Sequence, residues 1–471
     1  MCQGGAAFIY AFPGGRFAGR LPGMIENSRL RVYRGGAPLP GRYVLYWMQQ
    51  AQRTRCNHAL EWAVEAAVAC RLPLRVAFAL TDDFPEANAR HYAFMLEGLR
   101  DVAKALRERG IAFTVHRGDP PAVIAALASE AALLVGDVGY LRLQRQWREA
   151  VAARVRCPFT VVETDVVVPV SLVSDKEEYA ARTIRPKINR LRERFLVPLV
   201  QAPSDTLSRL ADAPADHPGI PALDDLRLDQ SVGPSPTFRG GQDAADAALA
   251  RFIRDKLPTY HTTRNDPANG ICSDMSPYLH FGQISPLDIS LQVRASGAPA
   301  EAIEAYLEEL IVRRELSMNF VHYQPAYDRY DALPDWARKT LDRHRHDPRE
   351  ICYNRNQLEN AATHDRYWNA AQQEMVITGK MHNYMRMYWG KKVIEWSPSP
   401  EVAFETLLYL NNKYELDGRD ANGFTGVAWC FGKHDRPWTE RPIFGTVRYM
   451  AASGLERKFD IEAYVRQVGN L

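Results

Sequence analysis

Large aromatic side chains gather in one part of the 471-residue sequence. Trp389 and Trp396 are seven residues apart, which places them on one face of a helix, and Trp368 precedes them on a helical segment of its own. Tryptophan is the most easily oxidised neutral side chain, so tryptophans in near contact can carry an electron hole. The same spacing is also the ordinary pattern of a hydrophobic core, and the stripe taken alone favours that simpler interpretation.

Two polar stretches could hold a phosphate or a sugar. Ser273, Asp274 and Ser276 stand just before Pro277, a residue suited to the first turn of a helix. The free N–H groups of a helix N-terminus bind phosphate, although simple capping would leave the same residues there. The loop Asp417–Gly423 could hold ribose and charged groups, but its composition is equally typical of a surface turn.

A few charged residues would acquire a chemical role if the fold buried them. Glu309 lies in an Arg-rich helical run, where a carboxylate most often belongs to a solvated salt-bridge face. In a pocket, burial would raise its pKa and let it donate a proton or a hydrogen bond. Arg386 and Asp435 are candidates for a buried ion pair, and a lone pair of this kind is usually structural.

Composition sets limits on compartment and partners. The net charge is only +3, so a nucleic-acid partner is permitted but any basic surface must be local. The seven cysteines form no CxxC pair and are odd in number, which favours reduced thiols in a cytosolic setting over disulfides or a metal site. No apolar run approaches membrane-spanning length. The Gly-rich start lacks the apolar core of a signal peptide, and the sequence leaves open whether translation begins at Met1 or Met24.

The order of predicted elements indicates an α/β domain followed by an all-helical one. Strands are expected at Arg42–Met48, Leu74–Leu80, Ala112–His116, Ala132–Val135 and Phe159–Val168, alternating with helices, which predicts a five-stranded, parallel, doubly wound sheet. No GxGxxG follows the first strand, which disfavours a dinucleotide held by that fingerprint. We expect a loose tail over residues 1–40, the α/β domain over 41–200, a Pro-rich linker over 201–242 and helices over 243–471.

Five segments occur in the order and spacing of one known family: Trp47–Arg53, Ser276–Gln283, Glu308–Leu316, Tyr384–Trp396 and Leu410–Gly423. In these segments, and over roughly residues 43–450, the chain resembles class II cyclobutane pyrimidine dimer DNA photolyases. Any one of the motifs would be weak evidence. Their joint order and spacing are specific.

The resemblance implies an N-terminal antenna domain and a helical domain that holds FAD in a bent conformation. It implies light-driven repair of adjacent pyrimidines linked by UV, in which fully reduced anionic flavin lends an electron to the cyclobutane ring. The partner would be double- or single-stranded DNA that contains such dimers. The protein would be a cytoplasmic monomer, associated with the nucleoid through DNA. The antenna pigment, if one binds, is left open between 8-hydroxy-5-deazaflavin and methenyltetrahydrofolate.

The resemblance also assigns residues to roles. The flavin contacts would be Tyr260, Ser273, Asp274, Met275, Ser276, Arg386, Asn411, Asp417, Gly418 and Arg419, with Asn411 at the reactive N5 edge and Asp435 paired with Arg386. The lesion pocket would comprise Glu309, Met387 and Trp429. The photoreduction chain would run from Trp396 near the flavin through Trp368 to Trp389 at the surface. The DNA contacts would be Arg264, Asn265, Arg436, Trp438 and Arg448.

Four positions depart from the family pattern. Met318 stands where relatives often have Asp, Ala421 where Pro is usual, Thr446 where Lys is common, and Cys272 replaces a small polar residue. None of them removes a residue assigned to catalysis. The missing Lys puts one phosphate contact in doubt.

Three other functions remain to be weighed. A cryptochrome-like photosensor would use the same flavin fold, but such proteins usually add a long C-terminal tail, and this sequence ends at Leu471, shortly after Tyr449. A (6-4) photolyase would need a His pair at the lesion, and His280 and His434 do not stand in the matching places. A thermal flavin oxidoreductase would need a nicotinamide site, for which the sequence has no candidate.

Overall fold

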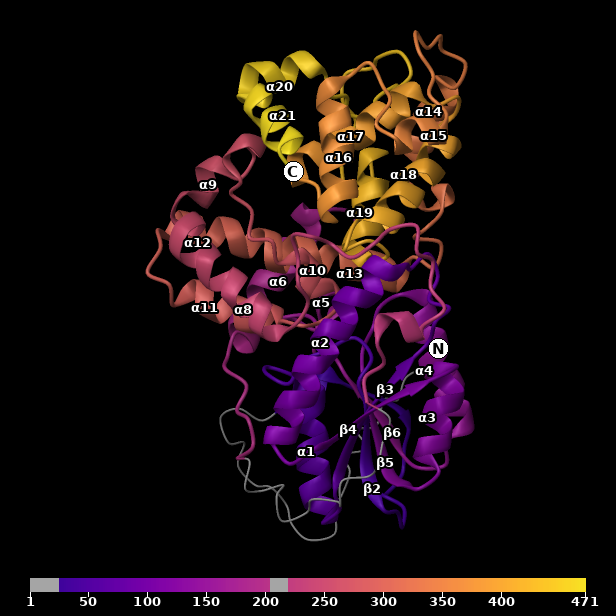
Figure 1. Cartoon of the computed structure of the whole chain (residues 1–471), viewed down its shortest axis with the longest axis vertical. Coiled ribbons are helices and arrows are strands. Elements are labelled where there is room, and N and C mark those ends of the chain that lie inside the picture. The colour runs from indigo at the N-terminus through magenta and orange to yellow at the C-terminus, as the bar shows by residue number, and fades with distance from the viewer. Residues whose placement is uncertain (1–24, 204–218) are drawn as a thin grey trace.

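The computed structural model describes residues 25–203 and 219–471, which form an α/β part and a helical part (Figure 1). Most of the expected N-terminal tail and the middle of the expected linker lie outside the described residues. Within the described part of the chain, none of the helices has the length and apolar character needed to cross a membrane.

The α/β part is built on one six-stranded sheet with the strand order β1-β6-β5-β2-β3-β4. Neighbouring strands from β6 to β4 pair in parallel, as the alternation of strands and helices predicts, but β1 pairs antiparallel with β6. The strands are β1 (Leu30–Arg34), β2 (Tyr43–Trp47), β3 (Leu74–Leu80), β4 (Ala112–Arg117), β5 (Ala131–Asp137) and β6 (Phe159–Val162).

The strand β1 corrects two expectations, because the sheet was predicted with five parallel strands and residues 1–40 as a loose tail. β1 is an edge strand that is only partly buried, so it lacks the continuous apolar run by which the central strands are recognised. Buried Arg29 fixes its start by donating to the carbonyls of Glu163, Val166 and Val167, 3.0, 3.1 and 2.6 Å away.

Alternate residues of the central strand β2 enter two different cores, which makes the sheet doubly wound. Leu45 packs in the same cluster as Ile124 of α3 (Pro120–Ala128) and Val151 of α4 (Arg142–Arg154). Val44 and Tyr46 instead pack with α1 (His58–Cys70) and α2 (Ala89–Glu108) on the other face.

The helical part continues directly from the last strand. α5 (Val170–Val173) and α6 (Ala181–Phe195) precede the linker, yet α6 is tied to the helical part by ion pairs from Arg185 to Glu308, at 2.7 Å, and from Arg192 to Glu304, at 3.1 Å. The described elements that follow are η2 (Leu223–Asp225), α8 (Gln242–Arg251), η3 (Phe252–Lys256), η4 (Leu257–Thr259), α9 (Tyr260–Thr263), η5 (Pro267–Asn269), α10 (Ser276–His280), α11 (Pro286–Arg294), α12 (Ala300–Leu307), η6 (Glu308–Arg313), α13 (Arg314–Tyr323), η7 (Tyr330–Ala332), α14 (Asp335–Arg343), α15 (Arg355–Glu359), α16 (Arg366–Thr378), α17 (Asn383–Trp396), α18 (Pro400–Tyr414), α19 (Ala421–Cys430), α20 (Ala452–Lys458) and α21 (Ile461–Gly469).

The first turn of α2 joins the two parts by capping the end of α18. Asn88 Nδ2 donates to the Lys413 carbonyl at 2.8 Å, and Arg90 Nη1 donates to the Tyr414 carbonyl at 3.0 Å. His91 Nε2 lies 3.1 Å from the Glu415 carbonyl, while its Nδ1 accepts from the Asn88 N–H, so Nε2 carries the proton and donates. Three consecutive carbonyls at the C-terminal end of α18 thereby accept hydrogen bonds from the α/β part.

Candidate functional site

The centre of the helical part holds one buried guanidinium beside two buried carboxylates. Arg386 of α17 points its Nη2 at Glu415, 2.8 Å from Oε2, and at Asp417, 3.1 Å from Oδ1. Both carboxylates lie in the turn after α18, and Ser276 at the start of α10 donates a hydrogen bond to Asp417. The predicted partner of Arg386 was Asp435, and that prediction is wrong. The Asp435 carboxylate instead accepts from the Trp438 indole N–H at 3.3 Å.

Burial and neighbouring charges shift the pKa values of the carboxyl groups in this cluster in different directions. Burial raises the pKa of Asp417, but the charge of Arg386 and the hydrogen bonds from Ser276 and Arg386 together hold that pKa below its ordinary value. Burial raises the pKa of Glu415 well above its ordinary range in spite of Arg386. Burial, together with the charge of Asp417, also raises the pKa of nearby Asp420 to about 6. The cluster therefore has more acidic groups than its cation can balance.

Several buried polar atoms of this cluster have no hydrogen-bond partner among the described residues. They are Arg386 Nε and both carboxylate oxygens of Glu415. A buried donor or acceptor that stays unpaired costs about 1–3 kcal/mol. Both donors and acceptors are left over, so the missing group must offer both kinds. The pyrimidine edge of a flavin does so, and the residues present fit that group.

The other assigned flavin contacts lie on both sides of this cluster. Asn411 is 2% exposed, and its Nδ2 donates to Asn412 Oδ1 at 3.1 Å. Met275 is buried at the start of α10. Asp274 has a left-handed φ of +59° and is ion-paired with Lys380 and, at 3.6 Å, with Lys256. The loop before α10 thus brings two lysines beside the proposed phosphate seat.

Two more of the assigned flavin contacts have a structural reason of their own, and their contact with the flavin stays a prediction. Gly418 packs against the end of α18, where an added Cβ would lie 2.7 Å from the Asn411 carbonyl oxygen, so the position requires glycine for packing. Arg419 has a left-handed φ of +61°, and its side chain lines a cavity on the α/β side of the loop.

Residues assigned to the lesion pocket and to DNA meet at a π-helical turn. Glu309 lies in η6, a π-helix, and its Oε1 is 2.8 Å from Nη1 of Arg264. The Arg264 guanidinium carbon lies 5.7 Å from the centre of the Tyr260 ring. Both members of the ion pair have side chains 30% exposed, so the pair is reachable from solvent. Exposed Asn265 follows Arg264 directly.

A second group stacks arginines on tryptophans. The Arg448 guanidinium carbon lies 4.9 Å from the Trp438 ring centre and 5.9 Å from that of Trp429, and Arg436 covers Trp438 at 5.3 Å. Lys391 Nζ donates to the Cys430 carbonyl and lies 5.9 Å from the Trp429 ring. Met387 is one helical turn before Lys391 on α17, so it faces the same side as Trp429.

The three tryptophans of the aromatic stripe are in contact, but in the reverse direction to the one predicted. Trp368 is stacked on Trp389, with centroids 6.4 Å apart, and meets Trp396 edge-on at 5.7 Å. On α17, Trp389 is about 4.5 Å beyond Arg386 along the axis, whereas Trp396 is about 15 Å beyond it. Trp389 is only 2% exposed, and it is Trp396 that lines an open surface pocket. The inner end of the chain is therefore Trp389.

The four departures from the family pattern are accommodated locally. Met318 is buried in the main core, and Ala421 takes the first position of α19, where Asp420 caps the helix by accepting from Gly423 N at 2.7 Å. The Thr446 backbone is held by hydrogen bonds to Thr340 and Trp438. Cys272 contributes its carbonyl to Lys256, 3.2 Å away.

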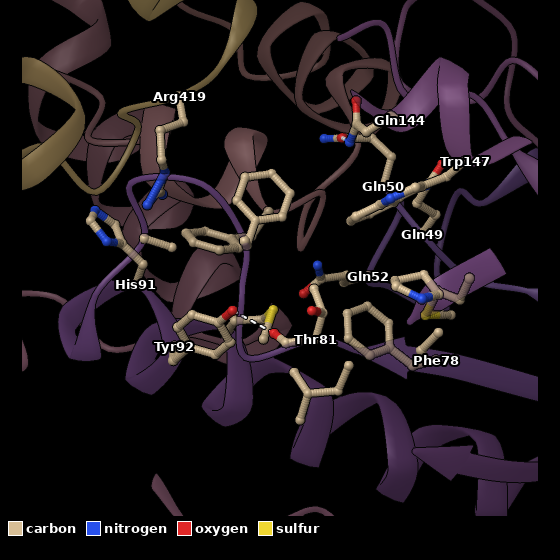
Figure 2. Close-up of a pocket in the computed structure, with 18 of the residues that line it drawn as sticks. Gln49, Gln50, Gln52, Phe78, Thr81, His91, Tyr92, Gln144, Trp147 and Arg419 are labelled. Carbon is tan, nitrogen blue, oxygen red and sulfur yellow. Dashed lines mark hydrogen bonds between the residues drawn. The ribbon is translucent and has the colours of Figure 1, made fainter. Parts of the chain in front are cut away.

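A cavity of about 110 Å³ lies where the carboxyl ends of β2 and β3 meet the helical part (Figure 2). Its wall includes Trp47, Gln49, Gln50, Gln52, Phe78, Tyr92, Gln144, Trp147, His280 and Arg419. Gln49 Nε2 and Gln52 Oε1 are buried without a partner in the described structure, so one donor and one acceptor are left over. The carboxyl edge of parallel strands is the usual ligand edge of such a sheet.

Sequence reasoning missed several residues of these sites. Gln49, Gln50 and Gln52 stand in the first family motif, and their position after a predicted strand was the signal that could have found them. Glu415 stands two residues before Asp417 in another motif. Lys391 gave no signal, because a lysine on an amphipathic helix is ordinarily solvent-exposed.

Comparisons with known proteins find photolyases that match nearly the whole chain. The family model described as DNA photolyase matches residues 44–205. A deoxyribodipyrimidine photo-lyase of Methanothermobacter thermautotrophicus is 53% identical over 452 residues, covering 95% of this chain and 99% of that one. One of Oryza sativa subsp. japonica is 40% identical, covering 94% and 91%. The crystal structure of a bacterial class III photolyase from Agrobacterium tumefaciens matches with a TM-score of 0.69 over 92% of this chain and 87% of that one, at 18% identity, and so shows the same fold.

Replacing Arg386 by Met should destabilise the apoprotein by roughly 3–5 kcal/mol, because buried carboxylates lose their cation. Burial alone would then hold the pKa values of Glu415 and Asp417 above their unfolded values. The folded variant would bind more protons than the unfolded chain, so its stability should fall as pH rises. Urea unfolding at about pH 5 and about pH 8 measures this, and the deficit against wild type should be larger at the higher pH.

The matched control is Arg386→Met combined with Glu415→Gln, which removes one uncompensated charge. It should recover part of the loss and reduce the pH dependence. If Arg386→Met alone loses the same amount of stability at both pH values, the pKa values of Glu415 and Asp417 do not depend on Arg386.

Proposed function

This chain belongs to the DNA photolyase family, and we propose that it is a deoxyribodipyrimidine photo-lyase, a carbon–carbon lyase that uses light to split cyclobutane pyrimidine dimers in UV-damaged DNA. The observation that carries the proposal is the 53% identity to a relative of that name over 99% of the relative's length. The five motifs support the proposal that the chain is a class II enzyme of the family. The weaker alternative is a cryptochrome-like photosensor, in which dimer repair would be absent.

FAD is the cofactor of the proposed reaction, and when bound in its reduced anionic form it supplies the excited electron that opens the dimer and then takes it back. The chain's own residues bind and orient it. Arg386 and Asp417 form the charged pair that would meet the ring. Asn411 packs close to Gly423, where an added Cβ would lie 3.0 Å from Asn411 Nδ2, and this packing would keep the amide in place. Lys256 and Lys380 stand beside the loop that would take the phosphates.

The lesion must leave the duplex to reach a buried site, and a distorted, weakly paired dimer is the least costly base pair to extrude. Trp429 offers a flat apolar face and Met387 a soft one for the extruded bases. Glu309, ion-paired with Arg264, would supply a carboxylate to the extruded bases. Arg448, stacked between the two tryptophans, keeps its N–H edges free to meet phosphates of the surrounding backbone.

The tryptophan chain would reload the cofactor after accidental oxidation. In this proposal Trp389 would be the electron donor nearest a bound flavin, Trp368 would refill Trp389, and Trp396 would refill Trp368. An external reductant at the surface then restores Trp396. The stacked and edge-on contacts at 6.4 and 5.7 Å make the three rings one continuous path.

The glutamine-lined cavity would hold the antenna pigment. A leftover amide donor on Gln49 and a leftover acceptor on Gln52 fit the amide edge of a flat heterocycle, and Trp147 and Phe78 supply apolar walls (Figure 2). Both a deazaflavin and a folate have such an edge. Arg419 is the charged side chain aimed into the cavity from the helical part, where burial lowers its pKa to about 10.

Replacing Trp429 by Ala should weaken binding of dimer-containing DNA by about tenfold or more, because stacking of a base on an aromatic ring contributes roughly 1–3 kcal/mol. Undamaged duplex should bind almost as before. The measurement is affinity for both duplexes, together with dimer repair under blue light by the FAD-loaded protein. Wild-type protein that binds FAD but repairs no dimers would reject the proposed function, and equal losses on both duplexes would reject the lesion pocket alone.

Replacing Trp389 by Phe should abolish light-driven reduction of oxidised flavin, because it breaks the chain at its inner end. Trp396→Phe should slow net reduction but leave the first electron transfer intact, since Trp368 still refills Trp389. Loss of the oxidised-flavin absorption under illumination measures net reduction, and transient absorption detects the tryptophan radical. Repair should persist in both variants after chemical reduction of the flavin. A Trp396→Phe protein that lacks the first transfer would restore the predicted order that the geometry reversed.

Replacing Gln52 by Leu should weaken binding of the antenna pigment while leaving FAD content unchanged. Purified FAD-loaded protein is titrated with 8-hydroxy-5-deazaflavin or with methenyltetrahydrofolate, and quenching of pigment fluorescence reports binding. We expect saturable binding of one of the two to wild type, with a loss of about tenfold in the variant if one buried hydrogen bond is removed. Unchanged affinity in Gln52→Leu would place the pigment elsewhere.

A further inference from the structure

The segment before α6 is fastened to the loop that follows α19, although the two are far apart in the sequence. Lys433 is ion-paired with Glu177. His434 Nδ1 lies 2.8 Å from the Tyr179 carbonyl, and the Tyr179 hydroxyl donates to the Asp435 carbonyl at 3.2 Å. These contacts hold residues 177–179 and 433–435 as one unit.

An arginine stacked on an exposed tyrosine projects from this unit. Tyr179 is 42% exposed, and the guanidinium carbon of exposed Arg182 lies 5.5 Å from its ring centre. On the other side of the same unit, exposed Arg436 covers Trp438 in the same manner. The unit is therefore flanked by two arginines, each stacked on an aromatic ring.

Most acidic groups around Arg182 are already engaged. Glu177 is paired with Lys433, and Glu178 with Lys187. Arg185 and Arg313 share Glu308. Asp175 is exposed, and its charge adds to the effect of burial in raising the pKa of the neighbouring Tyr323. Asp435, beside Arg436, is engaged by the Trp438 indole N–H. Apart from exposed Asp175, the acidic side chains named here are therefore already engaged by other groups, and Arg182 and Arg436 add positive charge to this surface.

We propose that Tyr179 and Arg182 extend the DNA-binding face, with Arg182 contacting a backbone phosphate of the bound duplex and Tyr179 positioning both Arg182 and the loop that carries Arg436. A guanidinium held flat on a ring keeps its N–H edge directed at solvent, in the planar geometry that matches phosphate oxygens. The Tyr179 hydroxyl fixes the backbone immediately before Arg436. This inference rests on the proposed function and adds to it a contribution from the chain segment before the linker.

The experiment compares Arg182→Ala, Tyr179→Phe and Tyr179→Ala in the FAD-loaded full chain. Affinity for dimer-containing and undamaged duplexes is measured at several salt concentrations. Arg100→Ala is the matched control, because Arg100 is an exposed arginine on α2 and its replacement makes the same change in net charge. Flavin content and melting temperature verify that each variant is folded.

Arg182→Ala should weaken both duplexes by the same factor and lower the slope of log affinity against log salt by about one unit, the signature of one lost phosphate contact. Tyr179→Phe keeps the ring under Arg182 and should retain that slope, with a smaller loss of affinity from the freed loop. Tyr179→Ala should lose both contributions.

Arg182→Ala that matches Arg100→Ala in affinity and salt slope would overturn the inference. Arg448→Ala in the same assay separates this outcome from failure of the proposed function. If Arg448→Ala weakens DNA binding while Arg182→Ala does not, the extended face is rejected and the repair function stands. If the wild-type protein shows no preference for dimer-containing DNA, the proposed function itself fails.

Discussion

A shortage of positive charge in the buried centre of the helical part is the constraint on which the rest of the site depends. Arg386 comes from α17, while Glu415, Asp417 and Asp420 come from the turn after α18. One cation cannot keep several buried carboxylates ionised, so a proton or a donor from a ligand must complete the balance. Arg386 and Glu415 are ion-paired, but Arg386 Nε and both Glu415 carboxylate oxygens make no hydrogen bond within the described residues. These free hydrogen-bonding positions are the ones that the proposed flavin would use.

The fold was largely predictable because parallel strands and amphipathic helices are recorded in local hydrophobic pattern. The central strands are nearly continuous apolar runs, and the sequence located each of them. β1 was not predicted because an edge strand needs no apolar run. Its register depends on Arg29, whose hydrogen-bond partners lie more than a hundred residues away in the sequence. Such a partnership has no local signature, so only the assembled sheet reveals it.

Residue types in the site were predictable from the motifs, but partners and directions were not. Arg386 was identified, yet its partner changed from Asp435 to Glu415 and Asp417, because a motif fixes spacing along the chain and not which side chains meet across helices. The tryptophans were identified in the same way, but helical spacing is symmetric and does not say which end faces the ligand. The π-helix that presents Glu309 is likewise invisible to a pattern of helical period.

One loop connects the two candidate sites and fixes their separation. Asp417 faces Arg386, whereas Arg419, after a left-handed turn, faces the glutamine-lined cavity. The start of this loop is held by α2, which satisfies the carbonyls of residues 413, 414 and 415 in succession. Because these hydrogen bonds are buried, sliding the α/β part against the helical part would leave several carbonyls unpaired at once. If the antenna binds in the cavity and the flavin at Arg386, as proposed, the capping of a single helix would set the distance between them, and energy transfer would need no movement of the domains.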